Sequence, residues 1–273
     1  MSSDPDTAID ACTSLIESGR ETGNMVALAH AGRGMAYYQK GELDRALKDF
    51  DESLRWDSDN VVALAARGTI YTERREFDRA IRDLGKAIRR TPKAEFLHMR
   101  GVAYAGQGRH DRAIEDFDAA IKLDRSSWLA FGARAKSYAA LDRRDKAIEG
   151  FSEVIRLKAD FAPAWNDRCW SRAIIGQLDL ALADCEQALR LQPDYAEALD
   201  SRGFVHLKAD RLDSAIADYD ASLRLVPTNA YSLYGRGIAR RRKGDAAAGE
   251  ADIAAAKAIK TDIADVMARL GVR

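Results

Sequence analysis

Cysteine, proline and long apolar runs are scarce in this chain of 273 residues. Its three cysteines are too few for a disulfide scaffold, and none lies in a CxxC pair of the kind that binds zinc or performs thioredoxin-like chemistry. No apolar run approaches the roughly 18 residues that a membrane-spanning helix needs. The sequence therefore predicts a folded protein that is neither built on disulfides nor inserted in a membrane.

The chain also lacks an excess of either charge, because 43 basic residues balance 43 acidic ones. No long-range field gathers nucleic acid or draws the molecule to an anionic membrane, so we expect no nucleic-acid partner. Signatures of enzymes are missing too: there is no GxxxxGK[ST] or HExxH motif, and the four histidines are scattered along the chain. We therefore expect no catalytic residue, no cofactor and no bound metal.

An internal repeat of 33 or 34 residues organises the sequence. An arginine marks each unit, at Arg33, Arg67, Arg100, Arg134, Arg168, Arg202 and Arg236. A small residue follows it, at Gly34, Gly68, Gly101, Ala135, Cys169, Gly203 and Gly237. Sixteen places further on, six units have a large residue and the fifth has a cysteine, at Phe50, Leu84, Phe117, Phe151, Cys185, Tyr219 and Ile253. Small and large residues at fixed places are what two closely packed helices require.

Each unit has residues that are typical of the turn and the helix ends of a helical hairpin. Glycines suited to ending a helix stand at the expected turn, at Gly41, Gly108, Gly176 and Gly244. The second helix opens near an aspartate such as Asp44 or Asp213, which suits the capping of free amides and the positive end of the helix dipole. The sequence thus predicts a series of helix pairs that are stable only when stacked on their neighbours.

This pattern resembles the tetratricopeptide repeat (TPR), with small, small, aromatic and proline signals at positions 8, 20, 24 and 32 of 34. The resemblance implies an all-α, right-handed α-solenoid of about seven hairpins with N- and C-terminal capping helices. The expected units are residues 27–60, 61–93, 94–127, 128–161, 162–195, 196–229 and 230–262. The caps are a half-repeat over 1–26 and a helix over 263–273. The family's aromatic residue at position 11 is replaced in the last three units by Arg172, His206 and Arg240.

Two further spacings link the helices of one unit. An aspartate follows the repeat arginine by sixteen residues in every unit except the fourth, which has Gly150. We interpret these residues as a repeated structural salt bridge, with Arg134 lacking this partner; an anion-binding ladder is the alternative. Cys169 and Cys185 have the same spacing and are interpreted as free buried cysteines, with a disulfide bond as the alternative.

The resemblance implies a binding surface, because TPR first helices line a concave groove. We take the groove residues to be Asn166, Asp167, Trp170, Asp200, Phe204, Tyr231, Tyr234, Met35 and Tyr38. Ordinary core packing is the alternative role for the aromatic members. No three consecutive units reproduce the lysine and asparagine clamp with which some TPR proteins hold an acidic tail. The acidic groove residues favour a basic or amphipathic peptide.

The sequence predicts a non-enzymatic scaffold or adaptor that binds a segment of a partner protein. The alternative is a structural solenoid that assembles into homo-oligomers. The N-terminus has neither a basic start nor an apolar segment, so the chain as written is expected in the cytoplasm. Residues 11–20 resemble the start of stand-alone bacterial TPR proteins, some of them exported, so the periplasm is the alternative if Met1 replaces a removed signal peptide.

Overall fold

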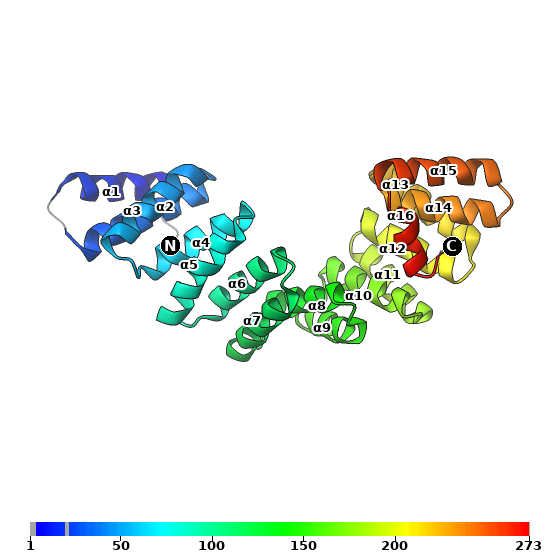
Figure 1. Ribbon diagram of the computed structural model, residues 1–273, viewed down its shortest axis with the longest axis horizontal. Helices are drawn as coiled ribbons and strands as arrows, with labels where there is room; N and C mark the ends of the chain where they lie inside the picture. Colours follow the sequence, from blue (N-terminus) through cyan, green and yellow to red (C-terminus); the bar gives the residue numbers. More distant parts are fainter. Residues whose placement is uncertain (1–3, 20–21, 273) are drawn as a thin grey trace. The chain divides into compact units, whose positions relative to one another are not determined.

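The computed structural model describes residues 4–19 and 22–272, which form α-helices and no strand (Figure 1). The outermost residues of both expected caps, 1–3 and 273, and residues 20–21 lie outside the described residues. The first eight helices are α1 (Pro5–Glu17), α2 (Asn24–Gln39), α3 (Leu43–Trp56), α4 (Val61–Glu73), α5 (Phe77–Arg90), α6 (Ala94–Gly106), α7 (His110–Leu123) and α8 (Trp128–Ala140). The remaining eight are α9 (Arg144–Leu157), α10 (Ala162–Ile174), α11 (Leu178–Leu191), α12 (Ala196–Lys208), α13 (Leu212–Leu225), α14 (Ala230–Arg242), α15 (Ala246–Ile259) and α16 (Ile263–Arg269).

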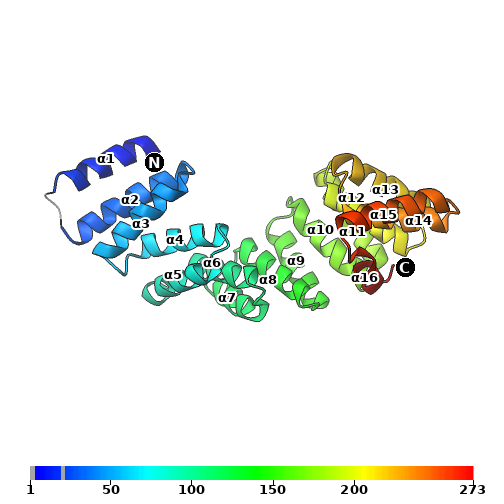
Figure 2. The same cartoon turned by 45° about the horizontal axis from the view of Figure 1, so that its top comes forward.

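Helices that follow one another in the chain pack as pairs, as the two views of the ribbon show (Figures 1 and 2). The chain divides into two compact units, residues 1–137 and 138–273. In the first unit α2 packs on α3, α4 on α5 and α6 on α7, while α1 packs on α2. In the second unit α10 packs on α11, α12 on α13 and α14 on α15, and α16 lies against α14 and α15. The fold is an all-α solenoid of stacked helix pairs.

Small residues let the two helices of a pair approach each other. A Cβ atom placed on Gly101 would lie 2.6 Å from the ring of Phe117, and Phe117 itself is fully buried. Gly34 of α2 and Phe50 of α3 repeat this contact, with a distance of 2.7 Å. These distances are shorter than any normal carbon contact, so only glycine fits beside the large residue. The spacing of small and large residues in the sequence therefore corresponds to the packing of the core.

The turns confirm one prediction from the sequence and correct another. Gly41 and Gly108 have φ angles of +75° and +76°, in the left-handed region that glycine adopts without strain. The expected capping by aspartate is wrong: Glu42 is the N-cap of α3 and Asp44 lies in the first turn, with no side-chain cap bond. Asp44 instead accepts a hydrogen bond from Arg74 of the next hairpin at 2.6 Å. The aspartate therefore links neighbouring hairpins.

The expected salt bridge between arginine and aspartate recurs along the solenoid. In the pair Arg100–Asp116 the guanidinium donates to both carboxylate oxygens, at 2.8 and 2.7 Å. The same pairing joins Arg33–Asp49, Arg67–Asp83, Arg168–Asp184, Arg202–Asp218 and Arg236–Asp252. Arg134 lacks that partner, as predicted, and pairs with Asp118 of the preceding hairpin. The pairing favours a structural salt bridge over an anion-binding ladder, because the chain's own carboxylates already occupy these guanidinium groups.

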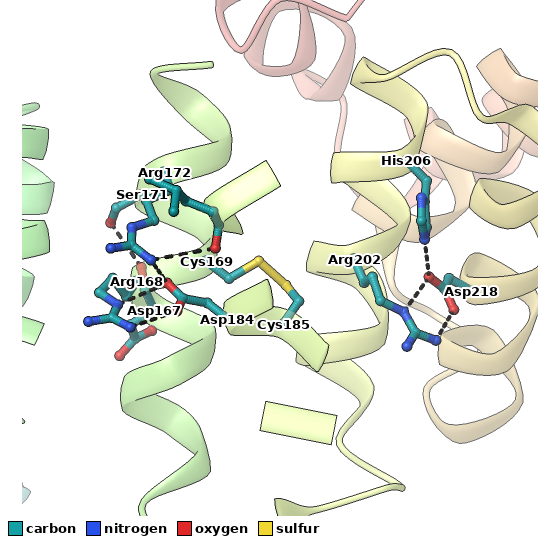
Figure 3. The surroundings of a disulfide bond; sticks show 11 residues. Asp167, Arg168, Cys169, Ser171, Arg172, Asp184, Cys185, Arg202, His206 and Asp218 are labelled. Carbon is teal, nitrogen blue, oxygen red and sulfur yellow. Dashed lines mark hydrogen bonds and ion pairs between the residues drawn. A yellow bond between two sulfur atoms is a disulfide. The ribbon is translucent and has the colours of Figure 1, made fainter. Parts of the chain in front are cut away.

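A disulfide bond joins Cys169 of α10 to Cys185 of α11 (Figure 3). The interpretation of both residues as free thiols is therefore wrong, whereas the proximity predicted from their spacing is correct, with Cα atoms 5.4 Å apart. The bond occupies the place at which other hairpins pack a glycine against a large side chain, such as Phe117 or Leu84. A small pair of residues at this place would leave a void, and the covalent bond closes the helix pair instead. Cys12 remains a free cysteine.

Candidate functional site

A pocket of about 420 Å³ opens on the face of the second unit that is formed by first helices of the hairpins. Helix α10 contacts α12, and α12 contacts α14; these three helices supply most of the pocket wall, and α16 closes one side. Its lining residues are Arg144, Asn166, Asp167, Trp170, Ile174, Glu197, Asp200, Ser201, Tyr231, Val266 and Leu270. The pocket thus combines aromatic, acidic and aliphatic side chains.

Five of the nine groove residues expected from the sequence line this pocket: Asn166, Asp167, Trp170, Asp200 and Tyr231. The helical period explains their convergence, since residues four apart, such as Asn166 and Trp170, lie on the same face of α10. The repeat of 34 residues then places Asp200 on α12 at the position that Asn166 occupies on α10. The pocket is therefore formed by equivalent faces of successive hairpins.

Phe204 and Tyr234 do not line the pocket. They are 1% and 8% exposed, and both belong to the hydrophobic core that includes Ile263 and Met267 of α16. The short terminal helix buries this part of the groove, which the repeat pattern alone predicts as open. Phe204 nevertheless lies directly beside the pocket, because its ring centroid is 4.7 Å from that of Trp170. It supports the Trp170 ring and offers no surface of its own to a partner.

Burial perturbs the pKa of one lining residue, Asp200, and of Tyr195, which interacts with the lining residue Asn166. Partial burial raises the pKa of Asp200 to about 6, against the opposing effect of the hydrogen bond that Ser232 donates to it, and the nearby charge of Glu197 raises it further. Burial and the charges of Asp167 and Glu197 raise the pKa of Tyr195 to about 12, although a hydrogen bond with Asn166 lowers it. The pocket thus disfavours additional negative charge.

The amide oxygen of Asn166 has no hydrogen-bond partner, although the residue is only 7% exposed. A buried polar atom without a partner is uncommon in folded proteins and costs about 1 to 3 kcal/mol. The Asn166 oxygen is an acceptor, so a bound group that satisfies it must donate a hydrogen bond. The pocket residue Asn166 therefore lacks a hydrogen-bond donor for its side-chain oxygen.

Several lining residues were missed by the reasoning from sequence. Glu197 occupies position 2 of its unit, the position of Tyr231 in the next, so the same positional rule was able to find it. Arg144 comes from α9, a second helix. Val266 lies in α16, and Leu270 is the residue that caps its C-terminus; both lie outside the repeat. Their presence depends on how the terminal helix and the preceding hairpin pack, which a repeat pattern does not encode.

The other two expected groove residues, Met35 and Tyr38, line a separate pocket of about 330 Å³ on the first unit. The Tyr38 hydroxyl donates a hydrogen bond of 2.8 Å to Glu73, which fixes the orientation of its ring. The remaining lining residues are Val62, Ala65, Ala66, Thr69, Lys93, Glu95, Phe96 and Met99. This pocket is mainly apolar, and it differs in chemistry from the acidic pocket of the second unit.

Comparison with protein families identifies the repeat. The chain matches the tetratricopeptide repeat family over residues 27–60, 65–127, 173–230 and 201–262, which together exceed half of its length. The chain therefore belongs to the tetratricopeptide repeat family. This family is generally a protein-interaction fold without catalytic activity. A search of curated proteins gives no match.

Solved structures share the fold at low sequence identity. A tetratricopeptide repeat protein from Parabacteroides merdae is 16% identical, with a TM-score of 0.71 over 90% of this chain and 98% of that one. The C-terminal part of a TPR protein from Cytophaga hutchinsonii is 18% identical, with a TM-score of 0.66 and coverage of 85% and 94%. YrrB, described as a TPR protein with an unusual peptide-binding site, is 20% identical, with a TM-score of 0.53 and coverage of 66% and 93%. At these identities the likeness shows the fold alone.

The described residues form neither a membrane-spanning helix nor a cluster of metal ligands. None of their helices has the length and apolar character that crossing a membrane requires. Within residues 4–19 and 22–272, no three histidine, cysteine, aspartate or glutamate side chains gather in a way that holds a metal ion.

Proposed function

We propose that the protein is a scaffold or adaptor that binds a segment of a partner protein in the pocket formed by α10, α12, α14 and α16. The observation that carries this proposal is the convergence of Trp170, Tyr231 and three polar groove residues on one cavity. Its volume falls within the range of about 300 to 1,000 Å³ that is common for ligand pockets. Partly buried aromatic residues bordered by polar ones are the usual composition of an interface hot spot.

The charge of the pocket favours a basic or amphipathic partner segment. Asp167, Glu197 and Asp200 line it, against a single lining cation, Arg144. Arg144 itself pairs with Asp142 at 2.9 Å, so part of its charge is already compensated outside the pocket. An acidic segment would meet like charges and is expected to bind weakly. The apolar pocket around Met35 and Tyr38 is proposed to contact apolar side chains of a partner.

A capture experiment tests this function. Wild-type protein, a Trp170→Ala/Tyr231→Ala variant and a Trp56→Ala control are immobilised and exposed to lysate of the source organism. Trp56 is a suitable control because it is 51% exposed on α3, in the other unit. We expect a protein that wild type and the control retain and the double variant loses. Equal retention by all three, with equal helicity by circular dichroism, would contradict the proposed site.

Self-assembly is the second candidate function. Leu28, Val62 and Leu129 occupy the same position in three units and are 54%, 49% and 52% exposed, which leaves apolar surface open on the first unit. A homo-oligomer would cover this surface. Light scattering over a hundredfold range of concentration distinguishes the two functions: a constant monomer mass favours the adaptor, and a mass that rises with concentration favours assembly.

The disulfide bond bears on the compartment in which the protein works. Disulfide bonds persist in the periplasm and outside the cell and are rare in the reducing cytosol. The Cys169–Cys185 bond therefore supports the periplasmic alternative over the cytoplasmic one. Acid quenching of intact cells, followed by alkylation of the unfolded protein in denaturant and mass spectrometry, tests this proposal, because both cysteines are fully buried in the folded chain. Protection of both cysteines until reductant is added is expected, whereas alkylation of both in untreated cells would place the protein in a reducing compartment.

A further inference from the structure

Two hydrogen-bond acceptors in the pocket of the second unit, on Asn166 and Asp200, are not paired with a cation of the chain. The Asn166 amide group forms a hydrogen bond with Tyr195, and the Asn166 oxygen remains without a partner. The side chain is 7% exposed, so bulk water has little access to this oxygen. An amide nitrogen that donates to Tyr195 holds the opposite end of the amide, the acceptor, in place. Asn166 therefore lines the pocket with a side-chain oxygen that no group of the chain satisfies.

Asp200 adds a second acceptor from the neighbouring helix. One of its carboxylate oxygens accepts a hydrogen bond from Ser232 of α14. No arginine or lysine pairs with Asp200 among the described residues, in contrast to the aspartates of the repeated salt bridges. An ionised carboxylate without a cation is costly at a partly buried place. A cationic donor from outside the chain removes this cost.

Aromatic rings border the same space. Trp170 and Tyr231 line the pocket, and the buried Phe204 ring packs against the Trp170 ring at a centroid distance of 4.7 Å. The faces of such rings attract cations, and a planar guanidinium also stacks on them. A ring that is supported on one side keeps its orientation when a ligand arrives, which lowers the entropy lost on binding.

We propose that this pocket recognises an arginine side chain, whose guanidinium donates hydrogen bonds to Asn166 and Asp200 and lies against Trp170 and Tyr231. The proposal rests on the proposed function, in that the arginine belongs to the bound partner segment. Arginine fits better than lysine because its guanidinium has five donors in one plane and is more weakly hydrated than an ammonium group. A guanidinium group can donate hydrogen bonds to two separate acceptors while it stacks on an aromatic ring, whereas an ammonium group acts as a point charge.

The chain's own Arg144 does not fill this role. Its guanidinium is bound to Asp142 through Nε at 2.9 Å, in the turn that precedes α9. The acceptor on Asn166 remains without a partner in its presence. Arg144 therefore lies on the pocket wall and leaves the inner acceptors to a ligand.

The test uses three peptides that differ in one side chain: acetyl-Gly-Arg-Gly-amide, acetyl-Gly-Lys-Gly-amide and acetyl-Gly-citrulline-Gly-amide. Citrulline has the shape of arginine without its charge. NMR titration of the full chain follows the indole N–H of Trp170 and the side-chain amide of Asn166. We expect the arginine peptide to bind at least fivefold more tightly than the lysine peptide, with the citrulline peptide weaker than both. Equal affinity for arginine and lysine, or no shift at Trp170 and Asn166, would overturn the proposal.

Two variants add an independent comparison. Asn166→Leu removes the inner acceptor, and Asp200→Asn removes the carboxylate; each is expected to weaken the arginine peptide at least tenfold. Asp194→Asn is the matched control, because Asp194 is exposed between α11 and α12 and does not line the pocket. Unchanged binding by folded Asn166→Leu protein would count against the proposal. If a variant fails to fold, the three peptides on wild type still decide the matter.

The peptide titration and the capture experiment fail in different ways. A captured partner together with equal affinity for arginine and lysine would retain the adaptor and reject the arginine pocket. A preference for the arginine peptide in a chain that captures no partner would retain the pocket and reject the adaptor function as proposed.

Discussion

Replacement of Asp200 by asparagine is predicted to stabilise the protein at neutral pH. Burial raises the pKa of Asp200 from 3.8 to about 6. The folded protein therefore holds the proton to a higher pH than the unfolded chain does, and the wild type loses stability as the pH rises through this interval. A pKa difference of one corresponds to about 1.4 kcal/mol, so the full loss above pH 6 is about 3 kcal/mol. Asparagine retains an acceptor for Ser232 without the charge.

Urea unfolding at several pH values measures this effect. At pH 7.5 we expect the Asp200→Asn variant to be more stable than wild type by about 3 kcal/mol, which is the whole of the loss estimated above. The difference is expected to fall to about 0.6 kcal/mol at pH 4 and to vanish by pH 3, where Asp200 is mostly protonated in the unfolded chain as well. Asp194→Asn serves as the control, since Asp194 is exposed. An equal gain at pH 4 and pH 7.5, or a loss at pH 7.5, would refute the reasoning that burial of the charge is responsible.

Three other predictions follow from the same contacts. Arg100→Ala removes the cation from Asp116, whose side chain is 8% exposed, and is expected to lower the free energy of unfolding by about 3 kcal/mol. Arg134→Ala removes the cation from the half-exposed Asp118 and is expected to lower it by about 1 kcal/mol or less; equal losses in urea unfolding would contradict the assignment. Reductant is expected to destabilise wild type by about 3 kcal/mol and to leave a Cys169→Ala/Cys185→Ala variant unchanged, as thermal melts with and without reductant will show. Binding of the arginine peptide is expected to be about fivefold to tenfold weaker at pH 5 than at pH 7.5, because Asp200 is then mostly protonated; a titration independent of pH would exclude Asp200 from the site.

The repeat allowed most of the fold to be predicted from the sequence. A large residue sixteen places after a glycine, as in Gly101 and Phe117, indicates two helices in contact, and the structure places the two side by side. The same spacing predicted the pairing of Arg100 with Asp116 and the proximity of Cys169 to Cys185. Spacing alone does not decide between two thiols and a disulfide, because both readings place the sulfur atoms close together.

The site was less predictable, because it depends on a segment outside the repeat. The positional rule brought Asn166, Trp170 and Tyr231 to one pocket. It also assigned Phe204 and Tyr234 to the open groove, where they are buried in the core that includes residues of α16. A rule derived from internal repeats assumes that each first helix has a free face. That assumption fails at the end of a solenoid, where the terminal helix packs on the last hairpin.

Two classes of aspartate in this solenoid show how a structural charge differs from a functional one. The aspartate at position 23 of a unit, such as Asp218, faces an arginine of the same hairpin, and the repeat supplies both partners together. Asp200 stands at position 5, where the equivalent residues on the adjacent first helices are Asn166 and Tyr234, neither of which is a cation. Selection for stability alone favours asparagine at such a place, because the buried charge destabilises the folded chain. The Asp200 carboxylate lines the same pocket as the unpartnered Asn166 oxygen, so the arginine proposed above would offset the cost of the buried charge.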